Sequence, residues 1–143
     1  AAMLHDIGKV SFSKKMLRQK EPLEASQMRL IRPHPKKGAT LLRALDKQDH
    51  EVANAVLYHH ERPDGRGYYG LDGETIPLPA LILAVAEVYD AMTSSRLRDQ
   101  LSNEEALSKL RFTRGERLDA DCVDALVGKL KPPPGSIPDE GWD

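Results

Sequence analysis

The sequence predicts an all-α fold for this chain of 143 residues. Stretches of alternating β-branched residues hardly occur, whereas apolar residues recur at helical spacing between prolines and glycines. The composition, 40% apolar and 30% charged, is typical of a globular protein rather than a disordered one. We therefore expect one helical bundle over residues 1–130, followed by a Pro-rich tail over residues 131–143 that is extended or loose.

Glycine and proline mark the first expected helices. Residues 1–7 have the pattern of the end of a buried helix, with Gly8 as its C-terminal stop. Pro22 is well placed to open the next helix, and Pro33 breaks it. The apolar contacts of that second helix are expected from Leu23, Met28, Leu30 and Ile31.

Two further helices are expected before a glycine-rich loop. Pro35 lies at the first turn of one of them. Its apolar positions are Ala39, Leu41, Leu42 and Leu45. Asp49 is expected to cap the next helix, which runs to about His60. The apolar face of that helix is Val52, Ala53, Val56 and Leu57.

The second half of the chain predicts a central helix and a final helix pair. Residues 78–94 are apolar on nearly every side, which indicates a central, buried helix. The final pair covers about residues 103–111 and 119–130 and is joined through Gly115.

Composition also limits the function. The net charge of −1 gives no reason to expect binding to a nucleic-acid polymer, although a local cluster of Lys and Arg can still bind a small anion. The single cysteine, Cys122, excludes an internal disulfide and fits a reducing cytosol. No apolar run is long enough to span a bilayer. We expect a cytoplasmic protein without membrane contact from this segment.

Histidines occupy suggestive positions. His50 looks like an ordinary surface residue near a helix start, and the others are His5, His34, His59 and His60. His59 and His60 are both in phase with apolar residues of the preceding helix, so they are expected to point toward its packed side rather than to water.

Two carboxylates are also expected to lie on packed, apolar sides of the chain. Glu87 lies four residues after Leu83 on the central apolar helix, and Asp6 lies between Leu4 and Ile7. Burying a carboxylate without a partner costs several kcal/mol, about 3–5 when an existing partner is removed, so a metal, a cation or a hydrogen-bond network is expected nearby.

Each signal has a structural alternative. The His-Asp pair can cap or pack, Glu87 can form a structural ion pair, Asp64-Gly65 is by default a turn, and Lys9 is by default a solvated side chain. Together, however, neutral imidazoles and carboxylates at several helix ends suit a divalent transition metal. A carboxylate can also bridge a metal pair about 3.5–4 Å apart, and such pairs activate water against phosphate esters.

The motifs that carry these residues follow one another in a recognisable order. They are HDIGK (5–9), HPKKG (34–38), HHERPDGRGYYG (59–70) and IPLPALILAVAEVYDAMTSSR (76–96). In order and spacing they resemble the HD-GYP branch of the HD phosphohydrolase superfamily, over roughly residues 1–125. The chain opens without an initiator Met, so we expect it to be part of a longer protein, with the family's first helices and first ligand before residue 1.

The resemblance implies an HD-domain helical bundle with a bi- or trinuclear metal centre, usually iron and sometimes manganese. It implies a phosphodiesterase that hydrolyses the bacterial second messenger cyclic di-GMP to linear pGpG, to GMP or to both, by a metal-activated hydroxide. It further implies a sensory or receiver domain upstream, as in two-component systems, and contact with GGDEF-type diguanylate cyclase domains.

The family's functional positions map onto this chain as follows. The positions that match metal ligands are His5, Asp6, His34, His59, His60 and Glu87. Asp6 would bridge the metals, and Asp6 and Lys9 would be the catalytic residues, with Lys9 near the scissile phosphate. The positions expected to contact substrate are Lys9, Asp64, Gly65, Gly67, Tyr68 and Arg96.

The chain departs from the family pattern at several positions. Tyr69 stands where the family has proline, Leu81 where it commonly has arginine, and the run after Arg96 is changed. Glu87 replaces an aspartate, and its extra methylene moves the carboxylate by more than ~1 Å, against a tolerance of about ±0.2 Å in metal coordination. These departures keep two alternatives open. One is a degenerate domain that binds cyclic di-GMP or a partner protein without turnover, and the other is a hydrolase of a different nucleotide or phosphate ester.

Overall fold

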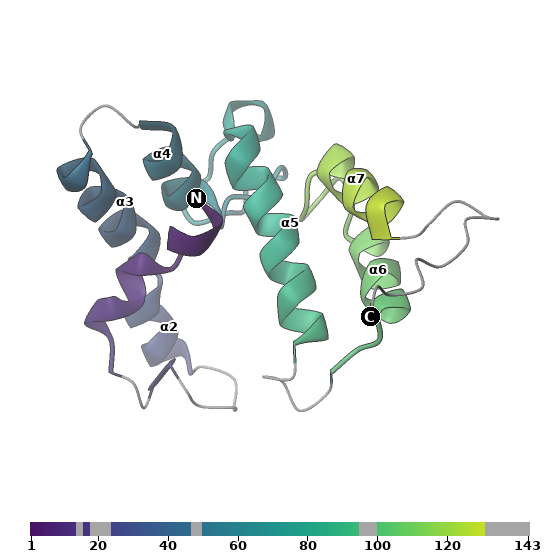
Figure 1. The fold of residues 1–143 in the computed structure, drawn as a ribbon, viewed down its shortest axis with the longest axis horizontal. Coiled ribbons are helices and arrows are strands. Elements are labelled where there is room, and N and C mark those ends of the chain that lie inside the picture. Colours follow the sequence, from purple (N-terminus) through teal and green to yellow (C-terminus); the bar gives the residue numbers. More distant parts are fainter. Residues whose placement is uncertain (14–15, 18–23, 47–49, 95–99, 131–143) are drawn as a thin grey trace, which may run out of the picture.

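The computed structural model describes residues 1–13, 16–17, 24–46, 50–94 and 100–130. These residues form helices and no strand, which confirms the all-α prediction (Figure 1). The predictions for Pro22, Leu23, Asp49, Arg96 and the tail fall outside the described ranges. The elements, with 3-10 helices written η, are η1 (Ala2–Leu4), η2 (Ile7–Ser11), α2 (Ala25–Ile31), α3 (His34–Leu45), α4 (His50–Tyr58), η3 (Gly73–Thr75), α5 (Leu78–Thr93), α6 (Asn103–Phe112) and α7 (Ala120–Leu130).

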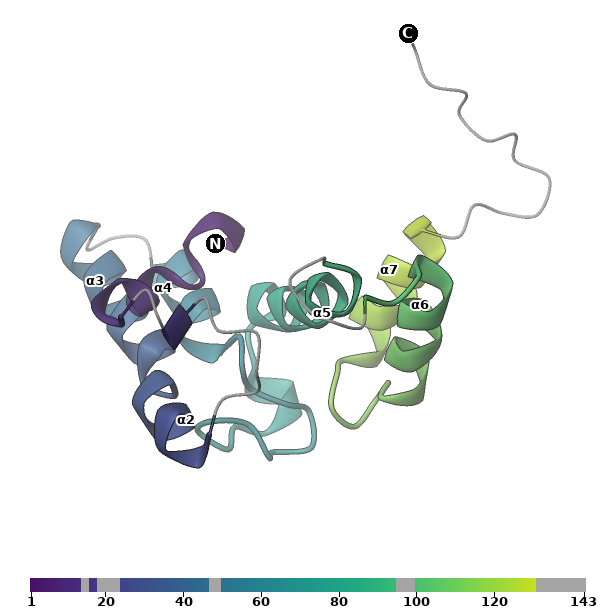
Figure 2. The same cartoon turned by 90° about the horizontal axis from the view of Figure 1, so that it is seen from below.

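Helix α5 stands between two groups of helices. Helices α3 and α4 pack on each other, η2 packs on α3, and α4 contacts α5. On the other side, α6 and α7 pack on α5 and on each other (Figures 1 and 2). We call η2, α3 and α4 the N-terminal lobe, and α5, α6 and α7 the C-terminal lobe.

The C-terminal lobe encloses a cluster of buried, mostly aliphatic side chains. Its members are Ile76, Ala80, Leu81, Val85, Leu107, Leu110, Leu118, Cys122, Val123 and Val127. Helix α6 begins with a capping box in which Ser102 Oγ accepts from the Glu105 amide and the Glu105 carboxylate accepts from the Ser102 amide. The connection to α7 turns at Gly115, whose φ of +82° favours glycine. The predicted final helix pair is therefore confirmed.

The N-terminal lobe is packed around small residues instead. A Cβ on Gly8 would lie 2.0 Å from the carbonyl oxygen of His34, so only glycine allows η2 to approach α3 this closely. Similarly, a Cβ on Gly38 would lie 3.0 Å from a methyl group of Val56, where α3 meets α4. The close backbone approach leaves room for imidazole rings rather than for large aliphatic side chains.

The start of the chain was predicted incorrectly. Residues 1–7 are not the end of a buried helix: they contain η1 and the start of η2, and Met3 is 99% exposed. Gly8 does not stop a helix but lies inside η2. The physical reason is the contact with His34, because the sequence shows a glycine but not the backbone that it must approach.

Several apolar positions expected inside are exposed. Met28 and Leu30 of α2, and Leu41 and Leu45 of α3, are exposed, Leu45 to 76%. The predicted bounds of α5 are confirmed to within one residue, yet this helix is not buried on every side, since Leu78 is 61% exposed. The described residues leave these positions uncovered. No helix in these ranges has the length and hydropathy needed to cross a bilayer.

Candidate metal centre

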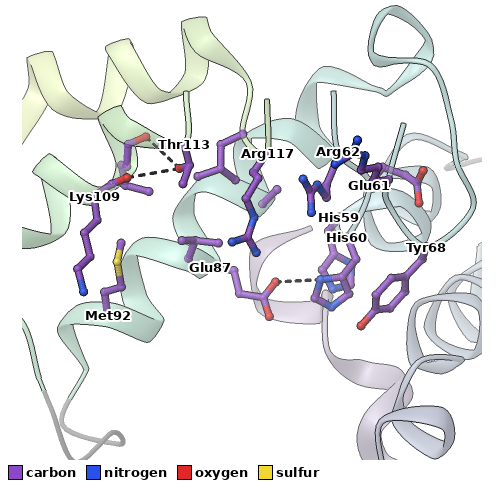
Figure 3. Close-up of a pocket in the computed structure, with 15 residues that line it drawn as sticks. His59, His60, Glu61, Arg62, Tyr68, Glu87, Met92, Lys109, Thr113 and Arg117 are labelled. Carbon is purple, nitrogen blue, oxygen red and sulfur yellow. Dashed lines mark hydrogen bonds and ion pairs between the residues drawn. The ribbon is translucent and has the colours of Figure 1, made fainter. Parts of the chain in front are cut away.

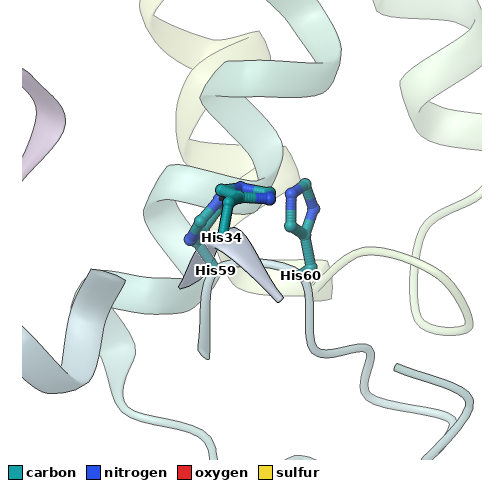
Figure 4. Close-up of side chains that lie close together, drawn as sticks. All are labelled: His34, His59 and His60. Carbon is teal, nitrogen blue, oxygen red and sulfur yellow. Dashed lines mark hydrogen bonds between the residues drawn. The ribbon is translucent and has the colours of Figure 1, made fainter. Parts of the chain in front are cut away.

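His34, His59 and His60 converge at the helix ends of the N-terminal lobe (Figure 4). His34 is the first residue of α3, and His59 and His60 directly follow α4. Nδ1 of His34 lies 2.9 Å from the Ile31 carbonyl oxygen. Nδ1 of His59 lies 2.7 Å from the Val56 carbonyl oxygen. A carbonyl only accepts, so Nδ1 carries the hydrogen in both rings, and Nε2 keeps its lone pair in the neutral form.

Those two Nε2 atoms face each other at 3.4 Å. Two neutral rings in this tautomer offer no hydrogen to share, so the lone pairs repel unless a cation lies between or beside them. Burial lowers the pKa of His59 to about 4. Burial and the neighbouring ring of His59 lower the pKa of His60 to about 3. Both rings are therefore neutral near pH 7, which is the form that binds metals.

A second group consists of His5, Asp6 and Glu87, and its possible ligand atoms also lie within 4.8 Å of one another. His5 comes from the turn after η1, and Glu87 from α5. His5 Nδ1 lies 2.6 Å from the Ala2 carbonyl oxygen, which again leaves Nε2 facing inward. Although glutamate is longer than the expected aspartate, the backbone of α5 thus places its carboxylate within this group.

Asp6 connects the two groups. Its Oδ1 lies 3.3 Å from His34 Nε2, and its carboxylate oxygens lie 2.7 and 2.8 Å from Lys9 Nζ. Burial alone would raise the pKa of the Asp6 carboxyl, but the neighbouring His34 ring and Lys9 ammonium outweigh burial and hold the pKa well below its usual range. Asp6 is therefore ionised at the point where both groups meet.

The residues present fit a metal. Oδ1 of Asp6 is buried, and despite its close neighbours no well-angled hydrogen bond reaches it from the described part of the chain. Glu87 has His60 Nδ1 at 3.7 Å, and burial raises the pKa of its carboxyl. Imidazole nitrogens with carboxylate oxygens are a typical donor set for divalent transition metals, and each group has at least three members.

The glycine-rich loop is held by a residue that the sequence did not single out. Glu61 is only 2% exposed, and its carboxylate accepts from the amides of Tyr69 at 2.7 Å and Leu71 at 2.8 Å. A Cβ on Gly67 would lie 2.6 Å from the Glu61 Cα, so the loop closes over Glu61 only because Gly67 has no side chain. Its partners are backbone amides, which leave no mark in a sequence.

Tyr69, which the resemblance aligns with a proline, takes part in this hydrogen bonding through its backbone. Its amide is one of the two donors to Glu61, and proline has no amide hydrogen to donate. The side chain is partly exposed and contacts the Tyr58 ring edge-on, with centroids 6.1 Å apart. The departure thus supplies a hydrogen bond to the loop that proline could not make.

The expected substrate-contact residues of this loop lie in different settings. The Tyr68 ring lies against His60, with centroids 4.6 Å apart, and the Arg32 guanidinium lies 4.9 Å from the Tyr68 centroid. The Asp64 carboxylate accepts from the Arg62 side chain and from a backbone amide, and Gly65 follows with a φ of +71°. Tyr68 therefore adjoins the candidate metal centre, whereas Asp64 and Gly65 shape the turn.

A cavity of about 460 Å³ extends from the centre toward the C-terminal lobe (Figure 3). His59, His60 and Glu87 line one side of it. Lys109 of α6 and Arg117 of the connection to α7 line the other side. These two basic residues could not be singled out from the sequence, because a single Lys or Arg on a helix or turn looks like any solvated side chain.

Comparisons with known proteins show the family to which the chain belongs. A family model described as HD domain matches residues 1–122. The chain is 41% identical over 130 residues to the cyclic di-GMP phosphodiesterase response regulator RpfG of Xanthomonas campestris, a match that covers 89% of this chain and 34% of that protein. It is 42% identical over 97 residues to the cyclic di-GMP phosphodiesterase PA4108 of Pseudomonas aeruginosa, covering 67% of this chain and 23% of that protein.

A relative with a different named substrate also matches. The chain is 30% identical over 130 residues to the 3'3'-cGAMP-specific phosphodiesterase 2 of Vibrio cholerae, covering 89% of this chain and 25% of that protein. The chain thus spans about a third or less of the length of these relatives.

Proposed function

The chain belongs to the HD domain family, as an HD-GYP member, and we propose that it is a metal-dependent phosphodiesterase that hydrolyses cyclic di-GMP. The observation that carries the proposal is the pair of ligand groups, His34–His59–His60 and His5–Asp6–Glu87, meeting at Asp6 beside a cavity with basic residues. Relatives named as cyclic di-GMP phosphodiesterases support the choice of substrate. We propose linear pGpG, GMP or both as products.

In this proposal the metal ions are iron or manganese. When bound, they would supply Lewis-acid activation of water for attack on the phosphodiester. His34 and His59 would hold one ion through Nε2, since their Nδ1 atoms are fixed to backbone carbonyls. His5 and Glu87 would hold a second, and Asp6, near both groups, would contact both ions.

The remaining residues would act on the substrate. The Lys9 ammonium lies against the Asp6 carboxylate, so its charge is at the cluster, where it would offset the negative charge that builds on the phosphate oxygens and can donate a proton to the leaving oxygen. Tyr68, whose pKa is raised by burial, would keep a neutral phenol beside His60 and shield that ligand from water.

A second candidate substrate is 3'3'-cGAMP, because relatives of comparable coverage are named as phosphodiesterases specific for it. It shares the two phosphodiesters of cyclic di-GMP and differs in one base. The same cluster would therefore serve either substrate, and the bases would decide between them. In either case we place the protein in the bacterial cytoplasm, downstream of a sensory or receiver domain and within reach of GGDEF-type cyclases.

The experiment is to purify the protein without air, quantify iron and manganese, and assay cyclic di-GMP and 3'3'-cGAMP separately. We expect bound metal, a linear product, and a higher kcat/KM for cyclic di-GMP. His59→Ala should lose metal and turnover, whereas His50→Ala, at the exposed start of α4, should keep both.

Two results would contradict the proposal. Stoichiometric metal without linear product from either dinucleotide would rule out the phosphodiesterase. Unchanged metal content in both His59→Ala and Asp6→Asn would rule out the assignment of the ligands.

A further inference from the structure

The side of the cavity opposite the metal centre is basic. Lys109 comes from α6, and Arg117 from the connection between α6 and α7. Figure 3 shows the Arg117 side chain reaching from that connection toward Glu87, and the Lys109 side chain running past Met92 at the far end. Both cations thus share a cavity with the candidate metal centre, although α6 and its connection to α7 supply none of the candidate ligands.

Neither cation is held in a close ion pair within the described part of the chain, although Glu105, one turn before Lys109 on α6, interacts with it electrostatically. The side chains of Lys109 and Arg117 form no ion pair or hydrogen bond with any described residue. Arg62, which lines the same cavity, is different because it is paired with Asp64. Arg117 therefore offers the planar set of N–H donors that suits a phosphate.

The position of Arg117 is fixed by its neighbours. Its amide donates to the Thr113 carbonyl at 3.1 Å, and the next residue, Leu118, is 6% exposed within the core of the C-terminal lobe. The Thr113 hydroxyl in turn donates to the Leu110 carbonyl at 3.0 Å, which ties the turn to the end of α6. The backbone that bears the Arg117 side chain is thus held in place by hydrogen bonds and by the adjoining core.

We propose that Arg117 and Lys109 form an anion subsite for the phosphate of the cyclic dinucleotide that is not being cleaved. The inference rests on the proposed function, because it assumes that one phosphate lies at the metal centre. Two riboses separate the phosphates of a cyclic dinucleotide, so the second phosphate must lie elsewhere in the same cavity. At about 460 Å³, the cavity is within the range of about 300–1,000 Å³ that is usual for small-molecule sites.

The subsite predicts different behaviour for substrates with one phosphate and with two. A phosphodiester with a single phosphate, such as bis(p-nitrophenyl) phosphate, needs the metal centre but has no group for Arg117 and Lys109 to bind. A cyclic dinucleotide needs both. Removing either cation should therefore weaken the binding of the dinucleotide and leave turnover of the single-phosphate ester unchanged.

The test compares Arg117→Gln and Lys109→Gln with Arg111→Gln, a matched control on α6 that does not line the cavity. We expect Arg117→Gln to raise the KM for cyclic di-GMP about 10- to 100-fold, the loss of a charge-assisted phosphate contact, with a smaller rise for Lys109→Gln. Arg117→Lys should recover part of this loss. Turnover of bis(p-nitrophenyl) phosphate should stay unchanged in every variant, which also shows that each variant is folded.

Equilibrium binding of the bis-phosphorothioate analogue of cyclic di-GMP to the metal-loaded protein separates this inference from the proposed function. Turnover with an unchanged KM and unchanged analogue affinity in both Gln variants would overturn the subsite and leave the phosphodiesterase standing. Analogue binding that Arg117→Gln weakens, in a protein without turnover, would support the subsite and overturn the phosphodiesterase. A protein that neither turns over cyclic di-GMP nor binds the analogue would overturn both the subsite and the phosphodiesterase.

Discussion

The two lobes of this molecule are held together by different means. In the C-terminal lobe, α5, α6 and α7 bury aliphatic side chains such as Leu107 and Leu110, as an ordinary helical core does. In the N-terminal lobe, η2, α3 and α4 approach closely through Gly8 and Gly38, and the largest buried side chains there include the imidazole of His34. One lobe is built on apolar area, and the other on close backbone contact.

The difference bears on stability, because most of the candidate metal ligands lie in or beside the N-terminal lobe. Imidazoles with facing lone pairs and an ionised carboxylate add little cohesion without a cation, whereas each buried leucine of the other lobe contributes about 1.5–3 kcal/mol. We therefore expect the C-terminal lobe to supply most of the stability, and the N-terminal lobe to depend on glycine contacts and on metal. Substitutions in each lobe and in the loop between them test this division.

The largest effect should come from the apolar core. Leu110 has 0% exposure, so Leu110→Ala should lower the free energy of unfolding by about 2–5 kcal/mol, through lost burial and the cavity left behind. Urea unfolding measures this change. If the lobes are held by separate means, the folded variant should keep the metal content of the parent. Loss of metal from the folded variant would show that the C-terminal core also sets the geometry of the ligands.

A pair of Gly→Ala substitutions gives effects of opposite sign. Gly8→Ala places a methyl group against the backbone of His34, so it should cost about 1–3 kcal/mol and reduce metal content, because His34 must move. Gly128→Ala in α7 meets no atom of the described residues within 4 Å and should stabilise the protein by up to about 1 kcal/mol, the difference in helix propensity. Thermal unfolding and metal analysis check both, and equal shifts of the two variants would contradict the contrast between the lobes.

A smaller effect should come from the loop beside the centre. Tyr69→Pro removes the amide that donates to the buried Glu61 carboxylate, so it should cost about 1–2 kcal/mol. Tyr69→Ala keeps the amide and is the matched control for loss of the ring. Urea unfolding should rank Tyr69→Pro below Tyr69→Ala, and the reverse order would mean that the ring, not the amide, holds the loop.

The last prediction concerns chemical reactivity rather than stability. Burial and a hydrogen bond with Asp119 raise the pKa of the Cys122 thiol from 9.0 to about 12. The native thiol is therefore protonated up to strongly alkaline pH, and near pH 8 its thiolate fraction should be about 1,000-fold lower than in the unfolded chain. Iodoacetamide should modify the native protein slowly, at a rate that still rises above pH 9, whereas in urea the rate should level off there. A plateau near pH 9 in the native protein would show that the thiol opens to solvent.

The sequence was sufficient for much of the fold. Proline and glycine predicted the break at Pro33 and the link at Gly115, and apolar composition predicted the bounds of α5. These features are local, since a proline or a helix period acts within a few residues of itself. The helical phase of the preceding residues also predicted that His59 and His60 point inward. In the structure His59 is buried and His60 is half-buried, and both lie beside His34.

The sequence could not predict which partners meet. The roles of Glu87 and Asp6 as ligands stay predictions, but the structure brings Glu87 of α5 together with His5 and Asp6, which lie far away in the chain. It also shows that Leu45 and Leu78 are exposed, because helical periodicity identifies an apolar face without showing whether another element covers it.

The amino-acid sequence was enough to predict the helical class, most of the helix limits and the set of residues able to bind metal. Three features became visible only in the folded chain: Gly8 lies against His34, Glu61 holds the loop through backbone amides, and Arg117 lies in the same cavity as Glu87. The first set depends on residue type and local spacing, which can be read from the sequence. The second depends on backbone atoms, which nearly every residue shares, and on neighbours that lie far apart in the sequence and meet only when the chain folds.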